Sequence, residues 1–441
     1  LPADHTGHRA VLSRGYNRGG ALDRISLDGI PFVQRIGYDA EGNRVLVAYG
    51  NNVMTRYRYD PQTGRLTRQH TQAFINDGPD RLRPAGPLYA DEQLLYDLVG
   101  NVVELRQRAP GCGIPGTRLG PDALDRRFDH DPLYRLVRAD GRECEAAPPG
   151  PPGDIGPRCS DPTAVRPYSE EYRYDDVDNL VEIRHRQLRT SGATVVTRTL
   201  THPGPTNRLQ ALQQGTTSIR YSYDGCGNVT AESDSRRFSW GHHGRLTTFS
   251  VRAGSGPASL TASYRYNASG DRALKVVRMP GRTEVTAYID GALEHRWVDG
   301  IEQFLIHVGD DDQPIALIRV GPPLPGDHAT ELPVQYHFGD HLGSSQLVLG
   351  GATAADHSFV RREEYTPFGS TTFGGFGRKR FRFVGQECDS ESGLYAIGAR
   401  YYAPWLCRWT SCDPAGIADG LNLYSYASNN PVVARDTNGE A

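Results

Sequence analysis

The side chains of this sequence that could do chemistry are seven cysteines, a histidine pair and two aspartates near the end of the chain. The cysteines are widely spaced, at Cys112, Cys144, Cys159, Cys226, Cys388, Cys407 and Cys412. Because no CxxC pair occurs among them, their spacing argues against a zinc site, and His242-His243 is no better as a ligand pair. A chain of 441 residues does not need disulfides to fold, so we expect reduced thiols and no metal.

The two aspartates are Asp413, which precedes a proline, and Asp436, which precedes a threonine. No Ser/His/Asp or Cys/His motif accompanies them. Aspartate before Pro or Thr commonly starts a turn, and Arg400 upstream fits a surface or salt-bridging role. On the residues alone, turn formation is the favoured interpretation of both aspartates.

A tyrosine-aspartate unit recurs along the chain, with Gly or Asn and then Arg or Leu close behind. Clear copies begin at Tyr38, Tyr59, Tyr96, Tyr174 and Tyr223, and worn copies at His130, Trp240 and Tyr266. Around each unit, aromatic and then aliphatic residues alternate with polar ones, which places one set on each face of a strand. The Asp and Gly-Asn positions between them suit a short hairpin turn. Each copy therefore predicts a β-hairpin, and we interpret the Tyr-Asp pairs as turn chemistry.

The composition predicts an all-β chain. It has 50 Gly and 30 Pro, a larger share of the chain than the combined share of about 12% that is usual for these two residues. It also has 23 Tyr and 13 Phe but only 2 Met, which favours strands. Single hairpins are marginal in water, so we expect them to pair edge to edge into one spiralling sheet. Residues 145–167 are Pro-rich and predict a surface excursion. A second Pro-rich stretch, 320–333, marks the expected boundary between a repeat wall over 1–325 and a second domain over 326–441.

Charge and hydropathy exclude several classes of partner. The net charge is -3 with both signs interspersed, so neither nucleic acid nor an anionic membrane is an expected partner. No apolar run is long enough for a membrane span, and the start of the chain has no signal peptide. Because the chain also lacks an initiator methionine, we expect it to be a piece of a longer protein. No cofactor is predicted.

The last third contains an ordered series of motifs. They include Asp340-His341-Leu342-Gly343-Ser344, Ala399-Arg400-Tyr401-Tyr402, Asp413-Pro414-Ala415-Gly416, Asp419-Gly420-Leu421-Asn422-Leu423-Tyr424 and Asp436. This series resembles the Rhs-repeat-associated core domain of bacterial Rhs and YD-repeat proteins. Within that group the chain looks most like the C component of insecticidal Tc (ABC) toxin complexes.

The resemblance implies a spiralling YD-repeat β-hairpin sheet that forms part of a hollow shell, closed by an inward-curled core domain. A toxin polypeptide would follow the core, be cut from it by the shell itself, and stay enclosed until the bacterial complex delivers it to a target cell. The implied partners are a B-component-like shell partner or a missing N-terminal shell half, the enclosed C-terminal toxin and an injection component. Such a protein acts once on itself, so no activity on a free substrate is expected.

The resemblance also assigns Asp413, Asp436 and Arg400 to a self-cleaving site like that of an aspartic protease. Two carboxylates about 3 Å apart cannot both ionise, so they share a proton, and one serves as base while the other serves as acid. A guanidinium beside them would hold one carboxylate by a bidentate contact.

Two residues depart from the family pattern, Thr437 in place of proline and Glu440 in place of leucine. They leave open a non-catalytic structural or adhesive YD shell, as in teneurin-like proteins, whose core domain only plugs the barrel. A carbohydrate-binding β-repeat protein is a third interpretation, which requires aromatic platforms on one exposed face.

Overall fold

The computed structural model describes residues 7–78, 81–145, 156, 158–189, 192–204, 206–233, 235–310, 314–325, 332–375 and 379–440. Within these ranges the chain forms 33 β-strands and three short 3₁₀ helices, and no α-helix. The prediction of an all-β chain is therefore confirmed.

The first 27 strands form one sheet, here called the wall. Their bounds are β1 (Leu12–Tyr16), β2 (Leu22–Leu27), β3 (Ile30–Tyr38), β4 (Arg44–Tyr49), β5 (Val53–Tyr59), β6 (Leu66–Asn76), β7 (Leu82–Tyr96), β8 (Val102–Gln107), β9 (Leu124–His130), β10 (Leu136–Cys144), β11 (Val165–Tyr174), β12 (Leu180–Arg189), β13 (Gly192–Thr201), β14 (Ala211–Gln214), β15 (Thr217–Tyr223), β16 (Val229–Glu232), β17 (Arg236–Trp240), β18 (Leu246–Arg252), β19 (Ala258–Tyr266), β20 (Arg272–Met279), β21 (Arg282–Ile289), β22 (Leu293–Val298), β23 (Ile301–Gly309), β24 (Pro314–Val320), β25 (Val334–Gly339), β26 (Ser345–Gly351) and β27 (Phe359–Arg362).

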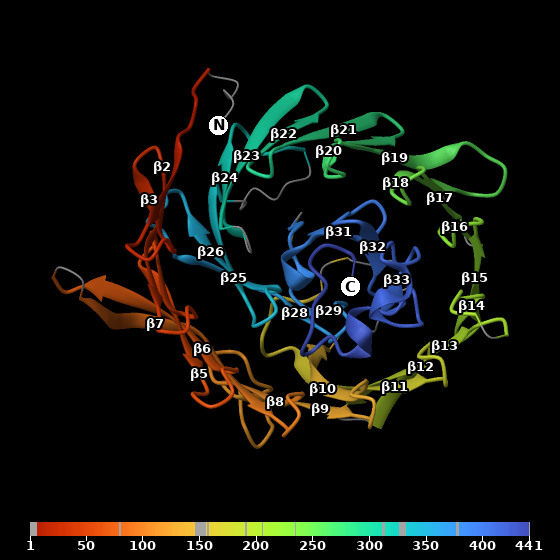
Figure 1. The fold of residues 1–441 in the computed structure, drawn as a ribbon, viewed down its shortest axis with the longest axis horizontal. Coiled ribbons are helices and arrows are strands. Elements are labelled where there is room, and N and C mark those ends of the chain that lie inside the picture. The colour runs from red at the N-terminus through yellow and green to blue at the C-terminus, as the bar shows by residue number, and fades with distance from the viewer. Residues whose placement is uncertain are drawn as a thin grey trace.

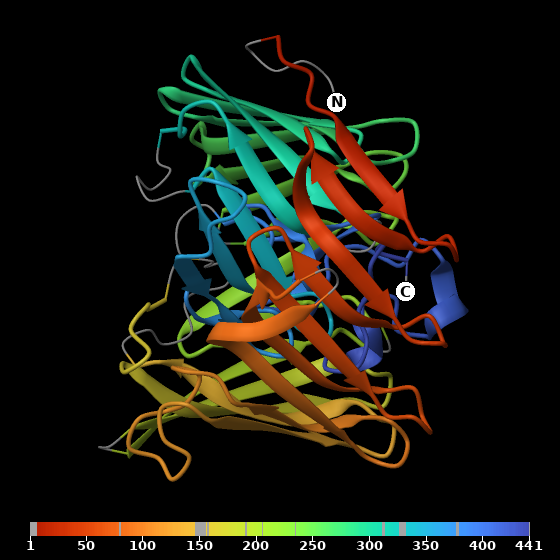
Figure 2. The same cartoon turned by 90° about the vertical axis from the view of Figure 1, so that its left-hand side faces the viewer.

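Each strand of the wall pairs antiparallel with the strand that follows it in the sequence, from β1–β2 to β26–β27. The predicted hairpins thus join side by side into one continuous sheet, which curls around the rest of the chain (Figures 1 and 2). Every Tyr-Asp unit connects an odd-numbered strand to the next even-numbered one. Their turns therefore lie along the same rim of the wall, and the β10–β11 connection lies on the opposite rim.

The aspartate of each unit caps the turn of its own hairpin. Asp97 Oδ1 accepts the backbone N–H groups of Val99, Gly100 and Asn101 at 3.0, 2.7 and 2.8 Å. These bonds satisfy donors that a tight turn leaves without a strand partner. The same contact recurs at the turn after Asp175. The interpretation of these pairs as turn chemistry is confirmed at both turns.

The tyrosine of each unit fastens its hairpin to the hairpin before it. Tyr96 Oη donates a hydrogen bond of 2.7 Å to the carbonyl of Leu66, the first residue of β6, and the guanidinium carbon of Arg65 lies 5.6 Å from the centre of the Tyr96 ring. The Gly-Arg-Leu part of one unit therefore receives the tyrosine of the next. Equivalent hydrogen bonds join Tyr38 to Leu22, Tyr174 to Leu136 and Tyr266 to Leu246.

The two ends of the wall meet through side chains, so the sheet is a spiral that overlaps itself. The ring of Phe32 in β3 stacks on Tyr336 in β25 at a centroid distance of 5.6 Å, and Tyr49 in β4 meets the edge of Phe338 at 4.8 Å. These residues belong to one buried cluster that joins the first strands to the last. We call this contact the seam.

The remaining short elements form an inner segment that lies inside the curl (Figure 1). Their bounds are β28 (Glu364–Tyr365), β29 (Thr371–Phe373), η1 (Phe383–Gly385), β30 (Glu387–Cys388), β31 (Tyr395–Ile397), β32 (Arg400–Ala403), β33 (Arg408–Trp409), η2 (Gly416–Asp419) and η3 (Ala427–Asn429). It has a buried aromatic core of its own and also packs on the wall, as where Phe368 meets the ring of Tyr172 at 5.1 Å.

The wall continues through β25, β26 and β27, beyond residue 326, where the sequence placed the start of a second domain. The division into 1–325 and 326–441 stays a prediction, since the sheet itself shows no break there.

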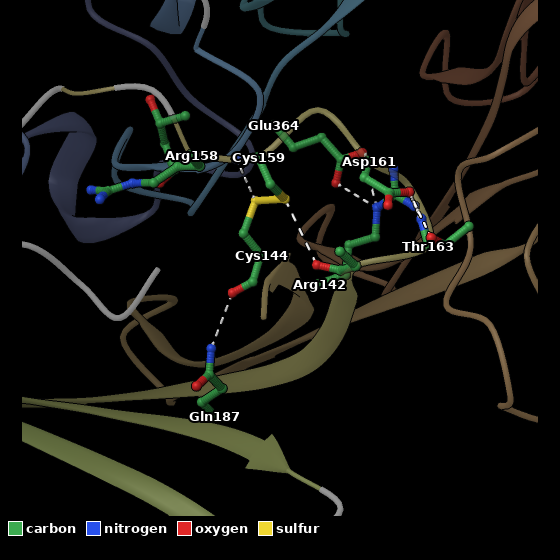
Figure 3. The surroundings of a disulfide bond; sticks show 10 residues. Arg142, Cys144, Arg158, Cys159, Asp161, Thr163, Gln187 and Glu364 are labelled. Carbon is green, nitrogen blue, oxygen red and sulfur yellow. Dashed lines mark hydrogen bonds and ion pairs between the residues drawn. A yellow bond between two sulfur atoms is a disulfide. The ribbon is translucent and has the colours of Figure 1, made fainter. Parts of the chain in front are cut away.

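The expectation that all cysteines are reduced was wrong for one pair, because Cys144 and Cys159 form a disulfide (Figure 3). Cys144 ends β10, and the chain must return to pair β11 beside it, which brings the two Cα atoms to 5.7 Å. The bond closes the base of the predicted excursion, of which residues 146–155 and 157 lie outside the described residues. The other five cysteines are free thiols.

The base of the excursion is also tied to the inner segment. The N–H of Arg158 donates to the carbonyl of Gly374, and the N–H of Gly374 donates to the carbonyl of Cys159, at 2.8 and 2.9 Å. Beside the disulfide, the fully buried Arg142 pairs with Glu364 at 2.5 Å (Figure 3). The rim opposite the Tyr-Asp turns is therefore linked to the start of the inner segment.

Candidate functional site

The Arg400 side chain is buried at the start of β32, directly after the turn that joins β31 to β32. Its guanidinium carbon lies 4.2 Å from the centre of the Trp409 ring in β33, the next strand of the small inner sheet. Stacking on an indole face fixes the plane of the guanidinium and leaves its edge free to donate. The inner sheet thus presents Arg400 in one orientation.

The structure brings the three residues named from the sequence together. Arg400 Nη2 lies 2.8 Å from Asp413 Oδ2 and 3.1 Å from Asp436 Oδ2. Asp413 lies in the loop that follows β33, and Asp436 lies in the terminal loop after η3. One guanidinium nitrogen therefore joins two carboxylates that are held by separate loops.

Both aspartates also form the turns that their sequence context predicts. Asp413 Oδ1 accepts the N–H of Ala415 at 2.8 Å, and Asp436 Oδ1 accepts the N–H groups of Asn438 and Gly439 at 3.1 and 2.7 Å. Each uses one oxygen for its turn and the other for Arg400. Turn formation and clustering are thus compatible, because a carboxylate has two acceptor atoms.

The two carboxylates differ in their access to solvent. The side chain of Asp436 is 1% exposed and that of Asp413 is 8% exposed, and Asp413 lies beside the exposed residues Pro414 and Ala415. Burial lowers the pKa of Arg400, and the negative charges of Asp413 and Asp436 oppose that shift. A buried cation between two acids is the arrangement that keeps a desolvated site close to charge balance.

The guanidinium also holds the backbone of the terminal loop. Arg400 Nε donates to the carbonyl of Gly439 at 2.7 Å, and the N–H of Ala399 donates to the carbonyl of Asn438 at 2.7 Å. The sequence predicted a bidentate grip on one carboxylate, and the structure instead shows one nitrogen shared by two carboxylates and a second nitrogen on a carbonyl. Residues 438–439 are thus bound along the β31–β32 turn.

Two glycines make this close approach possible. A Cβ on Gly398 would lie 2.0 Å from the carbonyl oxygen of Asn438, and a Cβ on Gly439 would lie 2.4 Å from the carbonyl oxygen of Ile397. Both have positive φ, at 49° and 73°. We call this crossing of two backbones the glycine clamp. Sequence reasoning missed Gly398, although its position two residues before Arg400 was the available signal.

A cavity of about 440 Å³ opens beside the glycine clamp, between the inner segment and strands β20–β23 of the wall. Its lining includes Arg245, Arg272, Tyr288, Glu294, Asn438 and Glu440. Asn438 and Glu440 of the terminal loop therefore line this cavity. Arg400, Asp413 and Asp436 do not line it.

A buried charge network fastens the inner segment to the wall at this cavity. Arg272 lies 2.5 Å from Glu387 and 2.7 Å from Asp389, and Lys275 lies 2.8 Å from Asp389. Burial alone would lower the pKa of Lys275, but Asp389 and Glu387 raise it well above its ordinary value. Because removing one partner would leave a buried charge, the network holds the inner segment in one position.

No group of three or more metal-ligating side chains is assembled among the described residues. In the same part of the chain, no helix has the length and apolar character needed to cross a membrane.

No family model matches the sequence of this chain. The chain is 28% identical over 437 residues to the toxin subunit YenC1 of Yersinia entomophaga, covering 93% of this chain and 42% of YenC1. It is 26% identical to the toxin protein Tse5 of Pseudomonas aeruginosa, covering 76% of this chain and 28% of Tse5. The chain thus spans less than half the length of either relative.

Two solved structures share the fold over almost the whole chain. A TcdB2-TccC3 crystal structure superposes with a TM-score of 0.81 and 27% identity, covering 98% of this chain and 21% of that one. A Tc holotoxin pore from Photorhabdus luminescens also gives a TM-score of 0.81 and 27% identity, covering 99% of this chain and 20% of that one.

Proposed function

Because this chain is an Rhs/YD-repeat protein of the kind found in the C subunits of Tc toxins, we propose that it is part of a shell that encloses a toxin polypeptide. In this proposal the inner segment cuts the chain once, near its terminal loop, and so separates a C-terminal toxin from the shell. The shell then keeps the freed toxin enclosed until it is delivered to a target cell.

One observation carries the proposal. The cluster of Arg400, Asp413 and Asp436 contacts the chain's own terminal loop, since Arg400 Nε holds the Gly439 carbonyl. An intramolecular cut needs its substrate bound beside the acid and base before the reaction, which replaces a bimolecular encounter. The contact between Arg400 and Gly439 supports the terminal loop as this substrate.

The chemistry assigns a role to each residue. Asp413, at the more exposed edge, takes a proton from the water that attacks the scissile carbonyl, and Asp436 supplies a proton to the nitrogen that departs. The carbon–nitrogen bond breaks, and a carboxyl end and an amino end are formed. Arg400 orients both carboxylates and holds the backbone that leads to the scissile bond.

We expect replacement of either acid to stop the cut. In a longer chain that carries a reporter protein after the terminal loop, Asp413→Asn and Asp436→Asn should each slow separation of the two parts by at least about 100-fold, because general acid or base catalysis is lost. Denaturing gels over time and mass spectrometry of the new chain end are the measurements. Asp224→Asn is the matched control, since Asp224 caps a wall turn in the same way. Normal cutting by both variants would reject the site.

A second candidate function is a non-catalytic plug, and one observation favours it. Each aspartate already has a structural task, because each caps a turn and pairs with Arg400. On this alternative the unmodified longer chain stays in one piece, and Asp413→Asn and Asp436→Asn only lower its thermal stability. The same gels and a thermal melt of each variant separate the two functions.

The proposed partners follow from the relatives. The solved neighbours are complexes described as TcdB2-TccC3, so a B-component-like partner that completes the wall is proposed for this chain as well. The enclosed toxin and a delivery component of the bacterial complex complete the set.

A further inference from the structure

The cavity beside the glycine clamp has the size and the lining of a binding site. Its volume of about 440 Å³ lies within the usual range of ligand sites. Leu293, Tyr288 and Phe381 give it apolar surface, and Ser269 and Gln386 add polar groups. A lining of this kind suits a guest that has both apolar and hydrogen-bonding parts.

Ser269 and Gln386 are available to form hydrogen bonds with a guest. Ser269 lies in the turn between β19 and β20, and Gln386 lies between η1 and β30. In the part of the chain that the structure describes, neither side chain makes a hydrogen bond. A hydroxyl and a side-chain amide can each donate and accept, which the N–H and C=O groups of a polypeptide require. The polar lining therefore suits an extended peptide segment.

Charge does not define the occupant of the cavity. Arg272 in its lining is paired with Glu387 at 2.5 Å. Arg245, Asp271 and Glu440 also line the cavity, and none of the three forms an ion pair with another described residue. Because these three charges include both signs, they largely offset one another. A small ion of either sign gains little from such a lining, so shape and hydrogen bonds select the guest.

The chain's own terminal loop leads to this cavity. Asn438 and Glu440 both line it. The backbone between them is held in place, because the N–H of Gly439 donates to Asp436 and its carbonyl accepts from Arg400, each at 2.7 Å. Consecutive Cα atoms lie only about 3.8 Å apart, so the residue that follows Glu440 in a longer chain begins at the edge of the cavity.

We propose that this cavity binds the residues that follow Glu440 in the chain that is cut, as an extended segment that leads toward the toxin. The inference rests on the proposed function and adds a second substrate-binding site to it. The glycine clamp holds the segment before Glu440, and the cavity holds the segment after it. Held on both sides, the substrate keeps one position beside Asp413 and Asp436, which lowers the entropy cost of the reaction.

Filling the cavity from its edge tests the proposal. Ser269→Trp places a large ring in the cavity from an exposed turn. In the longer chain with the reporter, we expect this variant to slow the cut roughly tenfold or more, because a small displacement of a bound substrate is costly.

Ala268→Trp is the matched control. Ala268 is the neighbouring exposed residue of the same turn, but it does not line the cavity. Because it is a surface substitution, this variant should cut within about twofold of the original rate. Thermal melts of the two tryptophan variants should coincide with that of the original chain, which shows that any slow cutting is not caused by unfolding.

A second measurement does not depend on cutting. In an Asp413→Asn background, a benzophenone amino acid is placed shortly after Glu440 and cross-linked by light, and mass spectrometry identifies the labelled residues. We expect labels on residues of the lining, such as Tyr288 and Leu293. The same probe placed within the reporter protein should label none of them.

The outcomes separate this proposal from the proposed function. If Asp413→Asn and Asp436→Asn both cut normally, the proposed function fails. If neither cuts, but Ser269→Trp cuts as fast as Ala268→Trp, the proposed function stands and the binding site in the cavity is rejected. Labelling that avoids the lining rejects the binding site in the same way.

Discussion

At the scale of single residues, the wall contains a buried cation that the proposed reaction does not use. The two ring nitrogens of His185 lie 3.0 Å from Glu170 and 3.0 Å from Glu143, and the ring stacks on Tyr168. Burial by itself lowers the pKa of His185, but the hydrogen bonds and charges of Glu143 and Glu170 outweigh it and raise the pKa to about 9. His185 is thus charged at neutral pH and joins β10, β11 and β12.

This raised pKa predicts a pH dependence of stability. Below pH ~6.5 the imidazole is protonated in both folded and unfolded chains, so the contribution is complete, and it is lost as pH rises through about 9. We expect the free energy of unfolding to fall by up to about 3 kcal/mol between these two pH values. Thermal melts should show this loss in the original chain and not in His185→Gln. The exposed His243, changed to Gln, should leave the pH profile as it was, and an unchanged profile for His185→Gln would contradict the assignment.

At the scale of elements, each Tyr-Asp hairpin makes a defined side-chain contact with the hairpin before it, here called the joint. The aspartate satisfies the turn of its own hairpin, while the tyrosine hydroxyl and the arginine before it connect successive hairpins. The joints at Tyr96, Tyr174 and Tyr266 each add one hydrogen bond and one arginine–ring contact to the backbone pairing. Repetition of this small joint along the wall adds to the stability of the long sheet.

Removing one hydroxyl tests the joint. Tyr174→Phe deletes the bond from Tyr174 Oη to the Leu136 carbonyl, which measures 2.8 Å, and leaves that carbonyl partly buried without its donor. We expect a loss of about 1 kcal/mol and faster amide exchange at the start of β10. The exposed Tyr16, changed to Phe, serves as control. Equal melts and equal exchange for the two variants would show that the hydroxyl does not join the hairpins.

At the scale of the whole molecule, the seam and the inner segment decide the shape. The seam holds the first strands on the last ones, and the inner segment fills part of the space within and positions the candidate site. The buried pairs of Arg142 with Glu364 and of Arg272 with Asp389 attach it to the wall at separate places. The wall and its contents therefore stabilise each other.

A cavity made at the seam by mutation should destabilise β4 and β25 together, although these two strands lie far apart in the sequence. Phe338→Ala removes a buried ring that packs on Tyr49, at a cost of about 3–5 kcal/mol. Amide exchange should then rise in β4 as well as in β25. Phe249→Ala removes an equally buried ring far from the seam and should leave β4 protected. If both variants affect β4 alike, the two ends of the wall are not held by this contact.

The candidate site shows how far the sequence could predict chemistry. The context of Asp413 and Asp436 predicted turns, and the turns are present. Their common contact with Arg400 depends on how three separated segments fold back, which no local pattern encodes. Gly398 and the Cys144–Cys159 disulfide were missed for the same reason, because each acts through a residue brought near only by the path of the chain.

The sequence by itself determined the all-β character and the hairpins of this protein. Period-two alternation and turn-forming Asp, Asn and Gly act over a few residues, where backbone bonding and burial are decided locally. The tertiary structure alone decided the seam, the position of the inner segment inside the wall and the cavity beside the glycine clamp. These features arise from packing between strands hundreds of residues apart, and packing depends on shapes that exist only after the sheet has curled.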